Sequence, residues 1–172
     1  IQNRGTIAGN LCNASPAADG VPPLLSLDAS VELASPAGRR VLPLNAFITG
    51  YRRTALGPGE ILTAVLVPRP APAARSAFVK LGARRYLVIS IVMAAAVVEM
   101  DAQGRIARAA VAVGSASPVA QRLPALEAEL CGLAGRPSAI LAPRHLAGLA
   151  PIDDVRATAA YRLEAARAAV GE

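Results

Sequence analysis

The sequence predicts an α+β protein in two parts, with a boundary near residue 72. The first part, residues 1–72, reads as a small α/β unit, and the second, residues 73–172, as a three-stranded antiparallel sheet packed on a three-helix bundle. Three prolines within residues 67–76 exclude the interior of a regular strand and indicate a stiff connector between the parts. After Pro118, β-type apolar runs give way to segments rich in Ala and Leu, and strands followed by helices are typical of the α+β class.

In the first part, short apolar runs separated by turn residues predict a hairpin and one further strand. Residues 31–33 alternate like a half-buried strand, the SPAG segment at 35–38 supplies turn residues, and residues 41–42 begin the return strand. We expect a short helix over 44–51 and a buried strand over 61–67.

In the second part, the apolar runs predict three strands, over 77–81, 89–100 and 106–113. The DAQG segment at 101–104 joins the last two, because its glycine tolerates the positive φ of a tight hairpin. This pattern predicts an antiparallel meander.

Three helices are expected after the strands. Residues 123–133 and 139–149 have a proline near their starts, as short helices often do. The third helix should follow Pro151, with Asp153 and Asp154 capping its N-terminus. Its predicted apolar face consists of Val155, Ala159, Leu163, Ala166 and Val170.

Composition and charge narrow the classes of function. The net charge is +6, but the arginines occur singly or in pairs, and only 3% of residues are aromatic, which disfavours nucleic-acid binding. The most apolar run, residues 87–98, is too short for a transmembrane span of about 20 residues. We therefore expect no nucleic-acid partner and no transmembrane segment.

The few cysteines and the single histidine argue against a metal-binding protein and against a hydrolase. Cys12 and Cys131 fit no metal-ligand spacing, and His145 is the only histidine, so we expect no bound metal and no hydrolytic catalytic set. Two cysteines without a disulfide framework favour a reducing compartment, which predicts a cytoplasmic location.

The stretch NRGTIAGNLCNASPAAD, residues 3–19, is the strongest candidate for a binding site. Gly5 and Gly9 have no side chain to block a ligand, so the backbone N–H groups could turn toward an anion such as a diphosphate. Thr6 and Asn10 would add side-chain donors. By itself, a glycine-rich loop is commonly just a turn, and that alternative stays open at this point.

Several separate motifs resemble one family. They are the stretch 3–19 and the segments YRRTAL (51–56), GEIL (59–62), SAFVKLGARRYLVISIV (76–92) and PIDDVRATAAYR (151–162). In this order they resemble the FAD-binding subunit of molybdenum hydroxylases, the group that contains carbon monoxide dehydrogenase and xanthine dehydrogenase. The resemblance extends over essentially the whole chain.

The resemblance implies a set of cofactor-binding residues. The FAD diphosphate would be cradled by Thr6, Ile7, Ala8, Gly9 and Asn10. Asp19 would contact the cofactor, Leu62 would lie near the adenine, Lys80 close to the flavin, and Ile89 over one face of its ring. The C-terminal domain would then lean over the flavin.

Each of these residues also has a plainer interpretation. Lys80 could be a solvated charge at a strand end, and Leu62 and Ile89 could be ordinary core residues. Asp19 could be a turn residue that bonds its own backbone before Gly20. Arg156, Tyr161 and Arg162 match the end of the family pattern, and we interpret them as packing and capping groups.

The chain also departs from the family pattern. Ala8 stands where glycine is usual, and its methyl group would cost about 1 kcal/mol if that position needs a positive φ. Val88 replaces a common acidic residue. The sequence has no counterpart of the N-terminal subdomain that holds the family's first FAD loop, which leads us to expect a fragment of a longer subunit.

The resemblance implies an oxidoreductase subunit that is inactive alone. Its FAD would take electrons from the iron–sulfur clusters of a 2Fe-2S subunit, within a complex that includes a molybdenum-cofactor subunit, and pass them to NAD or another acceptor. No side chain is needed as a nucleophile, because the redox chemistry belongs to the cofactor. The alternative is a non-catalytic assembly or remnant module that does not hold FAD firmly.

Overall fold

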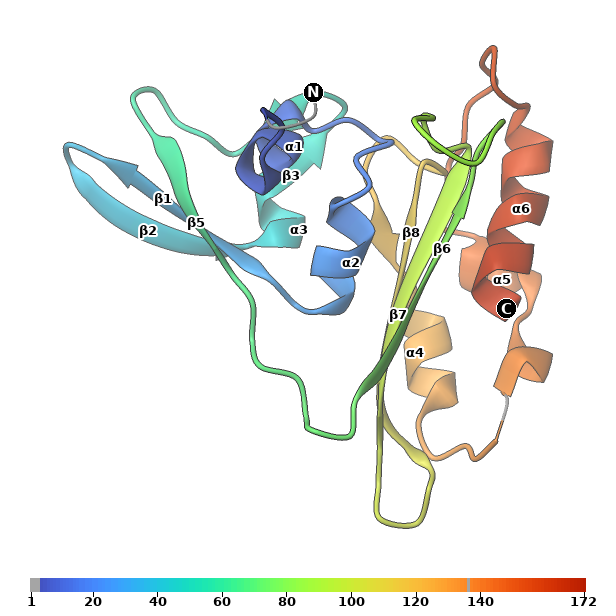
Figure 1. Ribbon diagram of the computed structural model, residues 1–172. Coiled ribbons are helices and arrows are strands. Elements are labelled where there is room, and N and C mark those ends of the chain that lie inside the picture. Colours follow the sequence, from blue (N-terminus) through green and yellow to red (C-terminus); the bar gives the residue numbers. More distant parts are fainter. Residues whose placement is uncertain (1–3, 136) are drawn as a thin grey trace.

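The computed structural model describes residues 4–135 and 137–172 of the chain and has a mixed α/β fold with antiparallel sheets (Figure 1). The prediction from the sequence of a protein that combines helices with antiparallel sheets is confirmed. The first part begins with two short helices, α1 (Ile7–Asn13) and α2 (Val21–Ser26). A sheet of order β2-β1-β5 follows, built from β1 (Ser30–Ser35), β2 (Gly38–Pro43) and β5 (Ile61–Leu66).

The predicted hairpin is confirmed. Strands β1 and β2 pair antiparallel from Ser30 opposite Pro43 to Ser35 opposite Gly38. Gly38 has a φ of +137°, which few other residues adopt, so this tight connection depends on the glycine.

Two other expectations for the first part are wrong. The helix expected over 44–51 stops after one turn, as α3 (Leu44–Phe47), and the chain continues as β3 (Ile48–Gly50) paired with β4 (Arg53–Thr54). Strand β5 is only partly buried, with Ile61 65% exposed, because it forms one edge of its sheet.

The second part is built on a sheet of order β6-β7-β8-β9, antiparallel throughout. Its strands are β6 (Arg75–Leu81), β7 (Val92–Met100), β8 (Ile106–Gly114) and β9 (Gln121–Arg122). Gly104 turns the chain between β7 and β8 with a φ of +74°. The sheet thus has a fourth strand, of two residues, beyond the predicted three, and β7 begins three residues later than predicted.

The helical segments after the sheet are shorter than expected. They are α4 (Pro124–Leu130), the 3-10 turn η1 (Pro137–Ile140), α5 (Pro143–Leu146) and α6 (Ala159–Gly171). The helix expected over 139–149 is interrupted because Pro143 cannot donate a backbone hydrogen bond and starts a new helical turn.

The start and the apolar face of the last helix also differ from expectation. Helix α6 is capped by Thr158, whose Oγ accepts from the N–H of Tyr161 at 3.2 Å. Asp153 does cap the N-terminus as predicted, because its Oδ1 accepts from the N–H of Ala159 at 2.5 Å, whereas Asp154 accepts from N–H groups in the turn before the helix. The Val155 side chain is fully exposed. Of the five residues predicted to form its apolar face, Ala166 is buried against the core.

Helices cover both faces of the C-terminal sheet. Helices α4 and α6 pack on one face, and α2, from the first part of the chain, packs on the other face against β7 and β8 (Figure 1). Ala112 of β8 therefore lies in the same buried cluster as Leu11 and Phe47. The two parts share a core across the connector.

Candidate functional site

The stretch Thr6–Asn10 forms the beginning of α1. Thr6 is its N-cap, with Oγ accepting from the N–H of Gly9 at 2.9 Å, and the first intrahelical bond runs from the N–H of Asn10 to the Thr6 carbonyl at 3.0 Å. The N–H groups of Ile7 and Ala8 precede that bond and so have no partner within the helix. Residues 4–7 are exposed and Ala8 is half-buried, so this first turn lies at the protein surface.

The departure at Ala8 carries no backbone strain. Ala8 lies in the first turn of α1 and is not among the residues with positive φ. The free-energy cost that we expected for its methyl group depended on a positive φ and therefore does not apply. A right-handed helical conformation suits alanine better than glycine.

Asn10 joins α1 to the start of α2. Its Oδ1 accepts from the N–H of Gly20 at 3.2 Å. A Cβ at position 20 would lie 2.9 Å from that oxygen, so a larger residue there would have to displace the Asn10 side chain. This bond fixes the side chain, with the amide nitrogen of Asn10 left as the group able to donate to a ligand.

Two of the predicted site residues, Asp19 and Lys80, meet. Lys80 extends from β6, and its ammonium lies against Oδ2 of Asp19, in the loop between α1 and α2. The other carboxylate oxygen of Asp19 accepts from the hydroxyl of Ser90 at 2.7 Å. Asp19 therefore forms contacts with two distant segments rather than with its own turn.

The Lys80–Asp19 pair stays accessible to solvent. The two side chains are 28% and 47% exposed. A pair of this exposure contributes little to stability, but it leaves the ammonium able to face an anionic or carbonyl-bearing ligand.

Sequence reasoning missed Ser90. It follows Ile89 directly within one of the family-like segments, yet no spacing rule links it to Asp19. Only the fold brings them together, across 71 sequence positions.

Leu62 and Ile89 lie on different elements. Leu62 is in β5 opposite Leu33, partly buried against the core, and α1 packs on this strand. Ile89 lies in the loop between β6 and β7 and is 58% exposed, so interpreting it as an ordinary core residue is wrong.

The rest of that loop is a solvated surface. Arg84 donates to the carbonyl of Leu87 at 2.6 Å, and the guanidinium of Arg85 lies 5.3 Å from the centre of the Tyr86 ring. Val88 is half-buried and has no polar group, so it offers no charged contact.

The structure also bears on the other functional classes. Among residues 4–135 and 137–172, no three His, Cys, Asp or Glu side chains gather into a metal-binding group. Within the same ranges, no helix has the length and apolar character needed to span a bilayer. Cys12 and Cys131 are free, and burial raises the pKa of the Cys12 thiol, which keeps it protonated beside the core.

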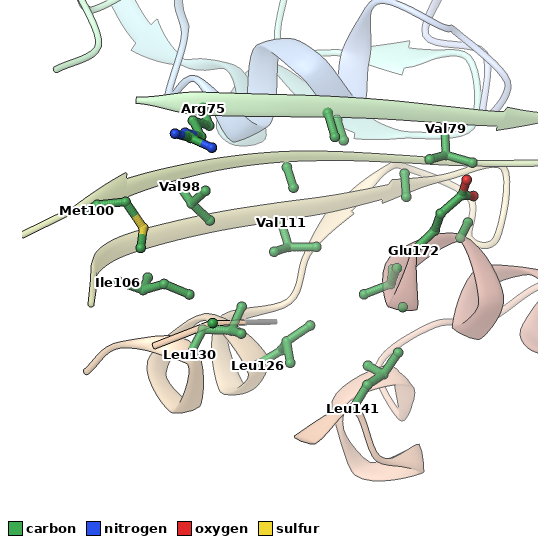
Figure 2. Close-up of a pocket in the computed structure, with 18 of the residues that line it drawn as sticks. Arg75, Val79, Val98, Met100, Ile106, Val111, Leu126, Leu130, Leu141 and Glu172 are labelled. Carbon is green, nitrogen blue, oxygen red and sulfur yellow. The ribbon is translucent and has the colours of Figure 1, made fainter. Parts of the chain in front are cut away.

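An open cavity of about 860 Å³ lies away from these residues, between the C-terminal sheet and helices α4 and α6 (Figure 2). Apolar side chains such as Val98, Val111 and Leu126 point into it, with Arg75 at one end. It contains none of the predicted site residues.

Comparisons with known proteins agree with this arrangement. Residues 1–70 match the family model of the FAD binding domain in molybdopterin dehydrogenase, and residues 77–172 that of the CO dehydrogenase flavoprotein C-terminal domain. The chain is 43% identical over 107 residues to the nicotinate dehydrogenase FAD-subunit of Eubacterium barkeri, covering 60% of the chain and 36% of that protein.

Two further similarities extend over nearly the whole chain. The 6-hydroxypseudooxynicotine dehydrogenase complex subunit alpha of Paenarthrobacter nicotinovorans is 34% identical over 172 residues, 99% of this chain and 58% of that subunit. A carbon monoxide dehydrogenase structure from Hydrogenophaga pseudoflava superimposes with a TM-score of 0.89 at 28% identity, covering 98% of this chain and 59% of that one. The chain thus spans less than two thirds of these relatives, and it belongs to the family of FAD-binding flavoprotein subunits that includes the CO dehydrogenase medium chain.

Proposed function

We propose that this chain binds FAD through the stretch 6–10 and the Asp19–Lys80 pair, and that it works as the flavoprotein part of a molybdenum hydroxylase. The observation that carries the proposal is the contact between Asp19 and Lys80, which are 61 positions apart. The resemblance assigns both residues to one cofactor site, and a shared site requires them to lie close together.

The donors in the described residues fit this cofactor. The N–H groups of Ile7 and Ala8, which have no partner within the helix, and the hydroxyl of Thr6 suit a diphosphate, which has only acceptor oxygens. The Lys80 ammonium suits the polar edge of a flavin. Gly9 has room for no larger residue without displacing the cap, because a Cβ there would lie 3.0 Å from the Thr6 Oγ.

Bound FAD would supply the redox chemistry, accepting electrons and passing them on. The residues of this chain would bind and orient it. Thr6, Ile7, Ala8, Gly9 and Asn10 would hold the diphosphate, and Leu62 would lie near the adenine. Lys80, held by Asp19, would place a positive charge beside the flavin, and Ile89 would cover one ring face and exclude water there.

In this proposal the two parts of the chain have different roles in FAD binding. Residues 1–72 would hold the diphosphate, and residues 73–172 would cover the flavin. Electrons would arrive from a 2Fe-2S subunit, in a complex with a molybdenum-cofactor subunit, and leave to an acceptor. The word "complex" in the name of the Paenarthrobacter relative supports such an assembly. NAD as the acceptor and a cytoplasmic location stay predictions.

A titration of the full chain with FAD tests the proposal. Flavin fluorescence should be quenched saturably, and the thermal unfolding midpoint should rise with FAD concentration, because a ligand that binds only the folded state stabilises it. Thr6→Ala, Asn10→Ala and Lys80→Ala should each weaken binding. Thr63→Ala and Arg69→Ala, exposed residues outside the site, serve as matched controls.

Two results would contradict the proposal. Equal loss of affinity in the site variants and in the controls would mean that the stretch 6–10 and Lys80 are not the site. Absence of quenching and of any midpoint shift at a large excess of FAD would favour the non-catalytic assembly module.

A further inference from the structure

We propose that Ser90 is a positioning residue, which holds the Asp19 carboxylate in the orientation that keeps Lys80 at the site. This inference rests on the proposed function in one respect, that Asp19 and Lys80 face the cofactor. Ser90 has no exposed surface, and its hydroxyl donates to Oδ1 of Asp19 at 2.7 Å while Oδ2 contacts Lys80.

The fold places Ser90 and Lys80 on the two chain segments that meet at the base of the loop between β6 and β7, which we call the loop neck. The N–H of Ile91 donates to the carbonyl of Leu81 at 2.8 Å and closes the loop 82–90 at its base. Lys80 directly precedes this closing pair on one side, and Ser90 precedes it on the other. Both side chains therefore reach Asp19 from neighbouring, fixed backbone positions.

A buried arginine stabilises the same neck. Arg162 of α6, 3% exposed, donates to the carbonyls of Ile91 at 2.5 Å and Ser115 at 3.1 Å. The N–H of Ser115 in turn donates to the carbonyl of Pro16 at 3.0 Å, in the loop that carries Asp19. One guanidinium thus connects the backbone on both sides of the Ser90–Asp19 bond.

The hydroxyl decides how Asp19 is oriented. The Asp19 side chain is 47% exposed, and an ion pair so accessible to water does not by itself fix a carboxylate rotamer. The hydrogen bond from the buried Ser90 hydroxyl does fix the carboxylate rotamer, because the closed loop neck holds the Ser90 backbone. A hydrogen bond to a charged group is also stronger and more directional than a neutral one. Without it, Asp19 is free to turn toward solvent, and Lys80 loses its fixed partner.

A double-mutant cycle on FAD affinity in the full chain tests this role. We expect Ser90→Ala to weaken FAD binding about tenfold, the size of one lost charge-assisted hydrogen bond. Ser90→Thr keeps the hydroxyl and should restore most of the affinity. Asp19→Ala/Ser90→Ala should bind no more weakly than Asp19→Ala alone, because Ser90 acts through the Asp19 carboxylate that the alanine removes.

A matched control separates positioning from general loss of stability. Ser117 is also buried, and its hydroxyl is hydrogen-bonded to the backbone of Ala116 and Ala150 and not to Asp19. Ser117→Ala should lower the unfolding midpoint while leaving FAD affinity within about twofold of wild type. Wild-type affinity in Ser90→Ala, or additive losses in the double variant, would overturn the role of Ser90.

Hydrogen exchange of the FAD-free chain keeps the inference testable if the cofactor site lies elsewhere. Ser90→Ala should speed exchange in residues 14–20 and 82–90 about tenfold relative to wild type and to Ser117→Ala. Unchanged exchange there would overturn the inference. FAD affinity that is insensitive to Asp19→Ala and Lys80→Ala, together with the faster exchange, would instead contradict the proposed function and leave the positioning of Asp19 by Ser90 supported.

Discussion

The guanidinium of Arg162 donates to the backbone carbonyl of Ile91 at 2.5 Å, across 71 sequence positions. The same side chain donates to Oδ1 of Asp154 at 2.7 Å and to the carbonyl of Ser115. Burial alone would raise the pKa of Asp154, but hydrogen bonds from the Arg156 N–H and from Arg162 hold it below its ordinary value. Helix α6 is therefore attached to the sheet by a buried charge with three acceptors.

Replacing Arg162 should be costly for stability. Arg162→Ala should lower the free energy of unfolding by about 3 kcal/mol, because it leaves two buried carbonyls without their donor and removes one of the cations that face Asp154. Arg162→Lys keeps the charge but lacks the planar fork, so we expect a smaller loss. Urea denaturation measures both. Arg167→Ala, at an exposed position of the same helix, should change stability by less than about 0.5 kcal/mol; an equal loss there would contradict the role of Arg162.

Stability should fall in acid partly through Glu60. Hydrogen bonds from the Arg40 side chain and then from the Gly57 N–H lower its pKa from 4.5 to about 2. A carboxyl with a lowered pKa stabilises the folded state above about pH 4.5, and this contribution is lost as the pH falls toward 2. Glu60→Gln should therefore lose less stability between pH 7 and pH 3 than wild type does in urea titrations. Arg40→Gln should show part of the same effect, and a wild-type pH dependence in both variants would contradict it.

The contribution of the α1 N-cap to the free energy of unfolding should be measurable without FAD. Thr6→Ala removes the acceptor of the Gly9 N–H and should cost about 1 kcal/mol of unfolding free energy. Thr6→Ser keeps the oxygen and should stay within a few tenths of wild type. If both variants lose the same amount in FAD-free denaturation, the loss comes from the Thr6 methyl group and not from the cap.

Two alanines of the C-terminal sheet should respond oppositely to enlargement. Ala96 of β7 is partly buried and lines the open cavity, so Ala96→Val should add apolar contact and strand propensity and stabilise the chain by about 1 kcal/mol. Ala112 of β8 has no exposed surface and lies in the packed cluster facing α2. Ala112→Val should destabilise the protein by about 1 kcal/mol or more, because a larger side chain in a closely packed cluster strains its neighbours. Equal signs in thermal unfolding would contradict the packing difference between the two faces.

The sequence by itself determined the local features of this protein. The hairpin with Gly38 and the turn at Gly104 follow from residues adjacent in the chain, because turn chemistry and strand alternation act over a few positions. The motifs around the stretch 3–19 and Lys80 identified the family, since they are read directly from the sequence.

Only the tertiary structure decided which distant residues meet. Helix α6 begins at Ala159 rather than just after Pro151, because Thr158 and Asp153 accept from its first N–H groups while Asp154 is engaged by Arg162. Residues 48–50 form a strand rather than a helical turn because β4 offers a partner. Ser90 was missed for the same reason: its role depends on the path of the chain across 71 positions, which no local pattern encodes.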